Sequence, residues 1–396
     1  MKVEDIVDLK GDYLFWEITS FFLQQKQYRI LSLSKNQNEL WLENLSNKQA
    51  PIIRLLRYDI NWSNWIRRDL QKTGSIGERI RRKFLRRKLT ILNIYLSTHP
   101  PVDDCTWLKD SYHFPAKRKV TVETCLIDHA GIQVGLSRLR EYTNSDVMID
   151  YSDKRLYSEE DVRISKSLAL NHAEKKQQQD NQLFHMSKPF FTYVFLALQV
   201  MMFLWLEWQG GSTDSRVLVK YGAKYNPLIL EGEWWRFFTP VFLHIGLLHL
   251  VMNSIALLYI GSEVERMFGN LRFVWIYLVA GMFGSIASFL FTVNISAGAS
   301  GAIFGCFGAL LYFGIMYPQI FFRTMGMNVI VIISINLLLG FTIQGIDNAG
   351  HIGGLVGGII ATGMVHFPNQ KNVKTQIGFI LGSMLLLCVA YLIGFS

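Results

Sequence analysis

Residues 298–308 read Gly-Ala-Ser-Gly-Ala-Ile-Phe-Gly-Cys-Phe-Gly, and residues 349–358 read Ala-Gly-His-Ile-Gly-Gly-Leu-Val-Gly-Gly. Both stretches are apolar and rich in glycine, and each carries one reactive side chain near its start, Ser300 in the first and His351 in the second. Polar and ionisable side chains are costly to hold at membrane depth, so they mark functional sites by default. Glycines four residues apart allow helices to approach closely. The two stretches therefore predict a serine nucleophile and its histidine base on neighbouring membrane helices.

Half of the residues are hydrophobic (50%), and the strongly apolar ones are concentrated after residue 188. Seven stretches there are close to the length that a bilayer crossing needs. They are Pro189–Trp208, Pro240–Ile260, Leu271–Phe291, Ser300–Tyr317, Asn328–Gln344, Gly350–Phe367 and Gln376–Phe395. The charged opening Met1–Asp5 has no apolar segment behind it, so a cleavable signal peptide is not expected.

The distribution of positive charge predicts the orientation. Of the 40 Lys and Arg residues, 31 lie in residues 1–188 and nine follow. Cytoplasmic segments retain positive charge, so we expect a cytoplasmic N-terminus, and an odd number of spans then places the C-terminus outside a plasma membrane. The long first outer loop, residues 209–239, breaks this pattern with four basic residues, and its Trp234, Trp235 and Arg236 indicate a position at the membrane interface.

This topology brings the polar residues of three spans into the outer leaflet. Ser300 and His351 each begin a span that runs inward, and His244, His249 and Asn253 lie in the first half of the second span. His249 and Asn253 are four residues apart, so they share one helical face. The amide of Asn253 and the backbone N–H at the start of the Ser300 helix are suitable donors for a developing oxyanion.

These motifs resemble the rhomboid family of intramembrane serine proteases. The matching pieces are Gly298-Ala299-Ser300-Gly301, His351 with Gly354 and Gly358, His244 with His249 and Asn253, and Trp235-Arg236 in the outer loop. The resemblance covers about residues 189–367, and the seventh span is similar to the extra C-terminal helix of many members. It implies an all-α polytopic core of seven transmembrane helices, arranged as six plus one.

The resemblance also implies the chemistry. Ser300 would be the nucleophile, His351 the general base and acid, and Asn253 with His249 the oxyanion site. Supporting positions would be His244, Phe304, Gly298, Gly301, Trp235 and Arg236. Phe304 would stack on the imidazole but has no hydroxyl to donate. Substrates would be transmembrane proteins cut near the outer end of a span, and no cofactor or metal is implied.

Two carboxylates lie near these motifs. Asp347 is four residues before His351, where a triad would place a carboxylate. The resemblance implies a serine–histidine dyad instead, so we interpret Asp347 as a solvated loop aspartate. Glu265, placed in the inner turn after the second span, matches a family glutamate. A capping or solvated carboxylate explains Glu265 equally well.

The sequence motifs of other intramembrane proteases are absent from the spans. A zinc protease would need a His-Glu-x-x-His helix and an aspartyl protease a pair of intramembrane aspartates, and neither pattern occurs in the spans. The histidines at 244, 249 and 351 have no acidic or thiolate partner in the outer leaflet, which disfavours a metal site. A transporter that relays protons through histidines, and an inactive rhomboid-like chaperone, remain as alternatives.

Residues 1–175 predict a small α+β cytoplasmic domain with a regulatory role, joined by a linker at 176–188 to the membrane domain at 189–396. Alternating apolar residues predict strands, and longer periodic stretches predict helices. The predicted strands are Tyr28–Ser34, Glu39–Leu45, Ile52–Arg57, Leu89–Leu96 and Lys119–Ile127, and the predicted helices are Asn61–Lys88 and Glu159–Gln179.

A basic run extends from Arg79 to Lys88. Contact with anionic lipid headgroups and a solvated helix face explain it equally well, and no nucleic acid partner is expected. Five residues of types that bind metals form a loose cluster: His99, Asp103, Asp104, Cys105 and His113. They could sense a divalent metal, but a simpler interpretation is that they are scattered surface residues. The four cysteines are interpreted as structural thiols.

Overall fold

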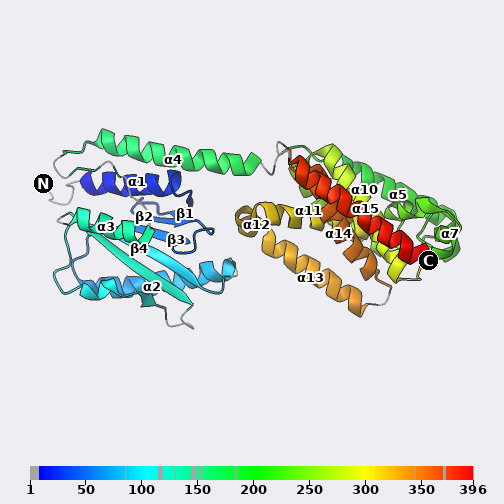
Figure 1. Cartoon of the computed structure of the whole chain (residues 1–396), viewed down its shortest axis with the longest axis horizontal. Helices are drawn as coiled ribbons and strands as arrows, with labels where there is room; N and C mark the ends of the chain where they lie inside the picture. The colour runs from blue at the N-terminus through cyan, green and yellow to red at the C-terminus, as the bar shows by residue number, and fades with distance from the viewer. Residues whose placement is uncertain are drawn as a thin grey trace. The chain divides into compact units, whose positions relative to one another are not determined.

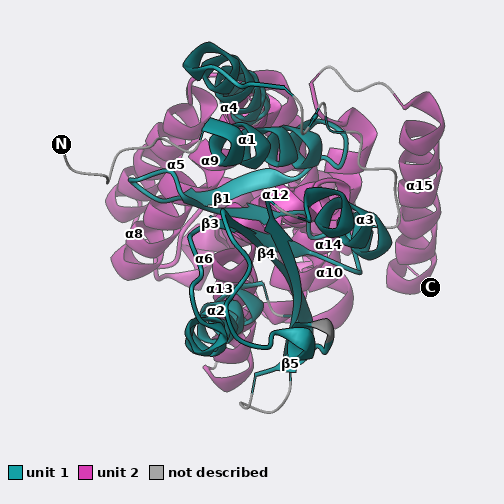
Figure 2. Cartoon of the chain, turned by 90° about the vertical axis from the view of Figure 1, so that its left-hand side faces the viewer, with its two compact units in different colours: residues 1–179 teal, residues 180–396 magenta. Residues whose placement is uncertain are grey.

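The computed structural model describes residues 9–395 except 85, 115–118, 130, 144–148, 150, 153–154, 183, 185, 344 and 369–371. The chain forms two compact units, residues 1–179 and residues 180–396 (Figure 2). Each unit has hydrophobic cores of its own.

The first unit is built on a six-stranded mixed sheet with the order β1-β2-β3-β4-β6-β5. Its strands are β1 (Arg29–Leu33), β2 (Glu39–Glu43), β3 (Ile52–Arg57), β4 (Leu89–Ser97), β5 (Tyr112–His113) and β6 (Val120–Asp128). The first three form an antiparallel meander, whereas β3, β4 and β6 run parallel. The five predicted strands are present, with ends that differ by no more than two residues, and β5 is an addition.

Helices cover both faces of this sheet (Figures 1 and 2). Helices α1 (Leu9–Gln24), α3 (Ile132–Thr143) and α4 (Glu159–Gln182) pack on one face, and α2 (Ser63–Lys83) packs on the other. A short 3₁₀ turn, η1 (Thr106–Lys109), precedes β5. Because α4 continues to Gln182, residues 176–182 of the expected linker are helical. The N-terminal half of the basic run lies at the end of α2.

A buried arginine joins α2 to the sheet. Arg54 of β3 is 1% exposed and pairs with Asp69 of α2, and its Nε donates to Glu39 at 2.8 Å. Thr73 accepts from Arg54 Nη1 at 2.7 Å, and the Tyr95 hydroxyl donates to Asp69 at 2.6 Å. Burial opposes the charge on Arg54, but the hydrogen bond and the charge of Asp69 outweigh it and raise the pKa of the guanidinium.

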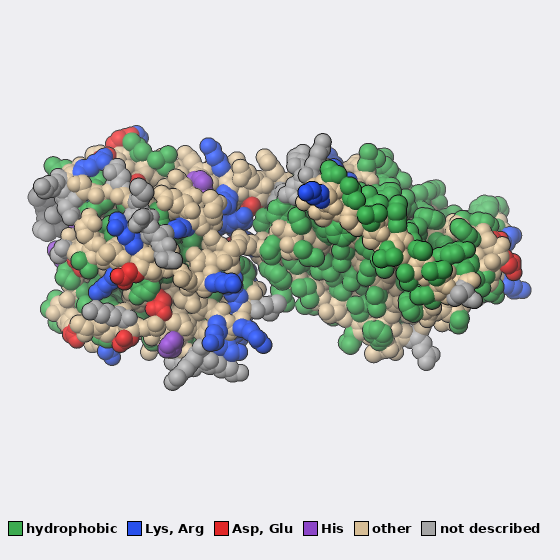
Figure 3. Space-filling view, in the orientation of Figure 1, with side chains coloured by type: hydrophobic (Ala, Val, Ile, Leu, Met, Phe, Trp, Pro, Cys, Tyr) green, Lys and Arg blue, Asp and Glu red, His purple; other side chains and the backbone are tan. Residues whose placement is uncertain are grey.

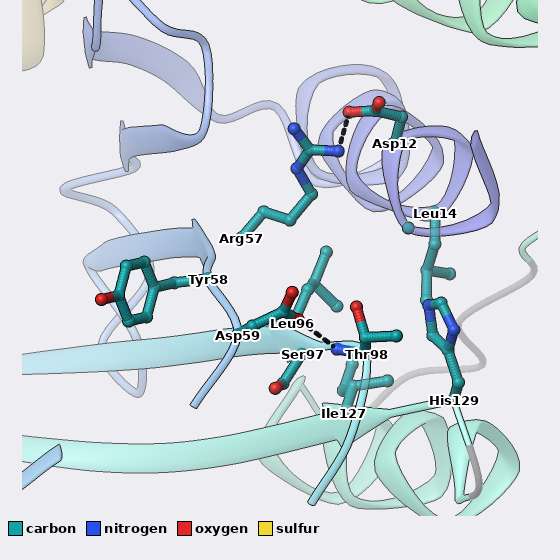
Figure 4. Close-up of a pocket in the computed structure, with 11 residues that line it drawn as sticks. Asp12, Leu14, Arg57, Tyr58, Asp59, Leu96, Ser97, Thr98, Ile127 and His129 are labelled. Atoms are coloured by element: carbon teal, nitrogen blue, oxygen red, sulfur yellow. Dashed lines mark hydrogen bonds and ion pairs between the residues drawn. The ribbon is translucent and has the colours of Figure 1, made fainter. Parts of the chain in front are cut away.

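A cavity of about 340 Å³ lies beyond the carboxyl ends of β3, β4 and β6 (Figure 4). Arg57 and Asp12 pair across it, and Asp59 accepts from the Thr98 N–H at 2.8 Å. Buried apolar side chains of Leu14, Leu96 and Ile127 form part of the wall. These two carboxylates and the guanidinium are therefore already bound to groups of the cavity itself.

Among the described residues of the second unit, the regular elements are helices and helical turns. Its elements are α5 (Phe191–Trp208), α6 (Ser215–Lys220), α7 (Asn226–Leu230), η2 (Trp234–Phe237), η3 (Thr239–Phe242), α8 (Leu247–Ala256), the π-helical turn η4 (Leu257–Gly261), α9 (Ser262–Phe268), α10 (Asn270–Phe291), α11 (Ser300–Met316), α12 (Pro318–Thr324), α13 (Gly326–Thr342), α14 (Asn348–Val365) and α15 (Val373–Phe395).

Within the described residues, four helices are long and apolar enough to cross a membrane: α5, the continuous run Leu247–Phe268, α10 and α15. The pair α12 and α13, bent by 73°, counts as a fifth if it forms one span. Helix α11 is apolar but shorter, with 17 residues. Large side chains remain exposed along these helices, such as Leu204, Leu338 and Leu385 at 61%, 65% and 66%. Hydrophobic side chains cover much of the face of this unit seen in Figure 3, which suits contact with lipid.

The second predicted span needed correction at both ends. Its helix begins at Leu247 instead of Pro240, because residues 239–242 form a 3₁₀ turn and Gly246 has a φ of +78° that interrupts a helix. His244 therefore lies in the loop before the helix. At the other end the helix continues to Phe268, so Glu265 lies inside α9 and not in a turn.

Candidate active site

Glycines bring α10, α11 and α14 into backbone contact. A Cβ placed on Gly354 would lie 2.0 Å from the carbonyl oxygen of Gly301, and one placed on Gly358 would lie 2.1 Å from that of Gly305. A Cβ on Gly284 of α10 would lie 2.8 Å from the Gly350 oxygen. No side chain other than hydrogen fits at these crossings, which confirms the close approach that the glycine spacing predicted.

Ser300 and His351 lie on either side of this crossing. Ser300 is the first residue of α11 and His351 is in the first turn of α14, and both helices begin at the same end of the crossing. The rings of Phe304 and His351 stack with centroids 4.2 Å apart and an interplanar angle of 9°. Ser300 is half-buried and His351 is 9% exposed. The structure therefore brings together the starts of the two helices that carry the hydroxyl and the imidazole, with a phenyl ring against the imidazole.

The loop before Ser300 is fixed by backbone hydrogen bonds. Gly298 N–H donates to the Pro240 oxygen at 2.9 Å, and Ala299 N–H donates to His244 Nε2 at 3.5 Å. Gly298 has a φ of +152°, and a Cβ there would lie 2.6 Å from Cε1 of His249. Glycine at 298 thus leaves room for the imidazole of His249 beside the loop.

Three further predicted site residues cluster beside this loop. His244 and His249 meet edge to face, with ring centroids 5.4 Å apart. The Asn253 amide donates one N–H to the His249 carbonyl oxygen at 2.9 Å. An amide has two N–H donors, so the second is available for another acceptor. His244 is fully buried, and Asn253 is 6% exposed.

In the first outer loop, Trp235 and Arg236 point in different directions. Arg236 is 4% exposed, pairs with Glu233 and donates from Nη1 to the oxygens of Val219 and Ala223 at 2.7 and 2.9 Å. Trp235 is half exposed (52%). The arginine therefore holds the loop together, and the tryptophan is turned outward.

Sequence reasoning missed Lys224 in the same loop. Its Nζ donates to the carbonyl oxygens of Thr292 and Asn294 at 2.9 and 2.8 Å, and its backbone pairs with Ser296 as a β-bridge. The residue has no exposed surface. Lys224 thus ties the outer loop to the segment that leads into Ser300. No local pattern distinguishes it from Lys220, four residues earlier.

The two carboxylates set aside in the sequence both act as caps. Glu265 accepts from the backbone N–H groups of Phe190, Phe191 and Thr192 at 2.8 to 2.9 Å, so it caps α5. Asp347 Oδ1 accepts from Gly350 N–H at 2.9 Å at the start of α14. The interpretation of Asp347 as a solvated loop aspartate is wrong, because its Oδ2 is buried.

The N-terminal residues proposed as a metal cluster also act within the fold. Asp103 accepts from the N–H and hydroxyl of Ser63 at 2.7 and 2.6 Å, and Asp104 accepts from Thr106 N–H at 2.9 Å. These carboxylates fix the start of α2 and of η1. The simpler interpretation of that cluster, as residues with separate local contacts, agrees with these bonds.

Comparison with known proteins identifies the family. A family model described as the Rhomboid domain matches residues 231–367. The chain is 39% identical over 382 residues to rhomboid protease GluP of Bacillus subtilis (strain 168). The aligned region covers 96% of this chain and 73% of that protein. It is also 40% identical over 146 residues to RHOMBOID-like protein 5 of Arabidopsis thaliana, covering 36% of this chain and 47% of that protein. The chain therefore belongs to the rhomboid family and is a multi-pass membrane protein and serine endopeptidase that acts on transmembrane substrates within the bilayer.

Proposed function

We propose that Ser300 and His351 are the catalytic dyad of this protease. Ser300 Oγ attacks the scissile carbonyl carbon while His351 takes the hydroxyl proton, and the π electrons of the carbonyl move to its oxygen. When the tetrahedral intermediate collapses, His351 returns the proton to the leaving amine and an acyl enzyme remains for hydrolysis by water. The observation that carries this assignment is the glycine crossing that brings α11 and α14 together at these two residues.

The oxyanion would be bound by donors from two helices. We assign this role to Asn253 and His249 of α8 and to the backbone N–H of Ser300 at the start of α11. Two features support the assignment. The Asn253 amide has a second N–H besides the one that donates to His249, and the N–H groups in the first turn of α11 have no acceptor within the helix. Loss of one such donor typically costs about 10²- to 10³-fold in rate.

The remaining site residues would support this geometry without touching the reacting atoms. His244 accepts from the loop before Ser300, and Gly298 leaves space for His249. Gly301 allows the contact with α14, and Phe304 holds the imidazole face. Arg236 fixes the outer loop, and we assign the exposed Trp235 to the membrane interface.

For the membrane arrangement we propose seven crossings, with a cytoplasmic N-terminus and an extracellular C-terminus in a plasma membrane. The excess of Lys and Arg in residues 1–188 supports this orientation. Under this arrangement the starts of α11 and α14 face outward. Substrates would accordingly be cut near the outer end of a transmembrane segment.

For residues 1–175 we propose a regulatory role, and for the basic run a contact with anionic lipid headgroups. Five cations of the run are exposed, namely Arg79, Arg82, Lys83, Arg87 and Lys88. Each would contribute about 1 kcal/mol near an anionic surface. Glu78 pairs with Arg81 and also with the exposed Arg82, and Arg86 donates to the Leu45 carbonyl oxygen, so these three have partners within the domain.

The test of the dyad uses the full chain in sealed liposomes with a model single-span substrate. We expect cleavage by the wild type and none by Ser300→Ala. Ser383→Ala on α15, where the hydroxyl bonds only within its own helix turn, is the matched control and should cleave normally. Equal cleavage by Ser300→Ala contradicts the assignment, and solute flux that survives this substitution would favour a transporter.

A further inference from the structure

The carboxylate of Asp347 has one oxygen that its capping role does not use. Oδ1 accepts from Gly350 N–H and satisfies the start of α14. Oδ2 is buried, and no described residue donates a hydrogen bond to it. A buried carboxylate oxygen without a donor is costly, and a cap formed by serine or asparagine would avoid that cost. The cap alone therefore does not explain why this position carries a charge.

The imidazole of His351 lies within reach of that charge. His351 is four residues after Asp347 at the start of the same helix, and its Nδ1 is likewise buried without a partner among the described residues. The carboxylate is within Coulombic range of the ring. His249 of α8 is the other titratable group in that range, and the Phe304 ring against the imidazole is neutral.

A cation of the outer loop also interacts electrostatically with this carboxylate. Lys224 is within Coulombic range of Asp347 and is bound to the segment before Ser300. Burial lowers the pKa of Lys224 to about 8, while the Asp347 carboxylate opposes that shift. Asp347 is thus the negative member of a group that also contains Lys224, His249 and His351.

The position of His351 in the first turn of α14 disfavours its protonated form, and a nearby negative charge would offset this effect. The start of a helix carries a partial positive charge, which disfavours an imidazolium in the first turn. His351 must nevertheless become an imidazolium when it accepts the serine proton. A carboxylate at the helix start opposes the dipole and attracts the new cation.

We propose that Asp347 is a positioning residue of this protease, whose second carboxylate oxygen stabilises the imidazolium of His351 and favours the tautomer with hydrogen on Nδ1. The proposal rests on the assignment of Ser300 and His351 as the dyad. In the step concerned, the Ser300 proton passes to His351 Nε2 as Oγ bonds to the carbonyl carbon. The resulting positive charge is shared by the ring, and Asp347 keeps its negative charge throughout.

Two substitutions that keep the helix cap but remove the charge distinguish this role from capping. Asn and Ser at position 347 both accept from a helix N–H but carry no charge, whereas Asp347→Ala removes cap and charge together. The matched control is Asp214→Asn, because Asp214 caps α6 with a 2.8 Å bond from Arg216 N–H in the outer loop. All variants are made in the full chain and assayed in liposomes from pH 5 to pH 9.

We expect Asp347→Asn and Asp347→Ser to lower kcat about tenfold, with KM and the thermal unfolding midpoint unchanged. Without the carboxylate the imidazolium loses its proton more readily, so the acid limb of the kcat profile moves to lower pH by about one unit. Labelling of Ser300 by a fluorophosphonate, which needs the same proton transfer but no substrate, slows by a similar factor. Asp214→Asn leaves all three measurements unchanged.

Wild-type kcat and an unmoved acid limb in either neutral cap overturn the proposal. A uniform loss of kcat at every pH with a lowered unfolding midpoint also overturns it, because a purely structural cap predicts that result. If Ser300→Ala itself cleaves, the dyad assignment fails and this proposal fails with it. If Ser300→Ala is inactive while the neutral caps behave as wild type, only the role of Asp347 is rejected.

Discussion

Two buried polar sites, one in each unit, are built in opposite ways. Around Arg54 in the first unit, each guanidinium nitrogen has an acceptor, and the carboxylate of Asp69 also receives the Tyr95 hydroxyl. Around the glycine crossing in the second unit, His351 Nδ1 and Asp347 Oδ2 are buried without partners among the described residues. A paired network stabilises one folded state, whereas unpaired groups are ready for a charge that appears during a reaction.

This difference predicts separate responses to substitution. Removing one member of a paired buried network leaves the other charged and unsatisfied, so the fold suffers. Removing a group that has no partner costs the fold little and affects only the chemistry. Substitution of Arg54 should therefore cost stability, whereas substitution of Ser300 or His351 should cost activity.

The largest effect is expected for Ser300→Ala and, in the same class, His351→Ala. We expect each to reduce kcat at least about 1,000-fold, because the nucleophile and its base act as one unit. The thermal unfolding midpoint of the full chain should remain within the error of wild type. An inactive variant that is also unfolded would break the contrast between the two units, and circular dichroism in detergent decides this.

The next largest effect is expected for Arg54→Ala. It leaves Asp69 buried without its cation, and we expect a loss of about 3–5 kcal/mol in the free energy of unfolding of the first unit. Pulse proteolysis of the full chain in urea measures this. The double variant Arg54→Met with Asp69→Leu should recover most of the loss, since no unpaired charge remains. A single variant as stable as wild type would show that the network contributes nothing.

A smaller effect is expected for Gly354→Ala. The new methyl group would overlap the Gly301 carbonyl oxygen, so α11 and α14 must separate by a fraction of an ångström or more. Misplacement of that order costs up to about 100-fold in kcat when the reacting groups lie on the two helices. Gly382→Ala on α15, where a Cβ meets nothing within 4 Å, is the control. Equal kcat for both variants would contradict the importance of the close crossing.

The sequence predicted the crossing because its signals are local. Glycine spacing, one serine and one histidine are readable within two short stretches, and the structure brings these stretches together. The strands of the first unit were predicted for the same reason, since apolar alternation is a local pattern. Helix α1 was missed because its apolar residues, such as Tyr13, Phe15 and Trp16, are buried all round and show no single apolar face.

Residues that act across long sequence separations could not be predicted. Glu265 caps a helix that begins 74 residues earlier, and Lys224 binds a segment that lies 68 to 70 residues later. Neither contact leaves a trace in the spacing of neighbouring residues. His244 was placed in a helix because its neighbours are apolar, and the interrupting conformation of Gly246 depends on the fold of the outer loop.

The smallest predicted effect is a pH dependence in the stability of the first unit. Burial raises the pKa of Cys125 to about 12, above its ordinary value of 9.0. The folded state therefore holds this proton more tightly than the unfolded state, and the resulting stability is fully present below pH 9 and declines as the pH rises toward the folded pKa. Between pH 9 and pH 10 we expect a loss of about 1 kcal/mol in the free energy of unfolding of the first unit, measured by pulse proteolysis. Cys125→Ala should remove that slope whatever its effect at pH 7, since alanine has no proton to lose. An unchanged slope in the variant would mean that this thiol is open to water and that the core around Cys125 is not sealed.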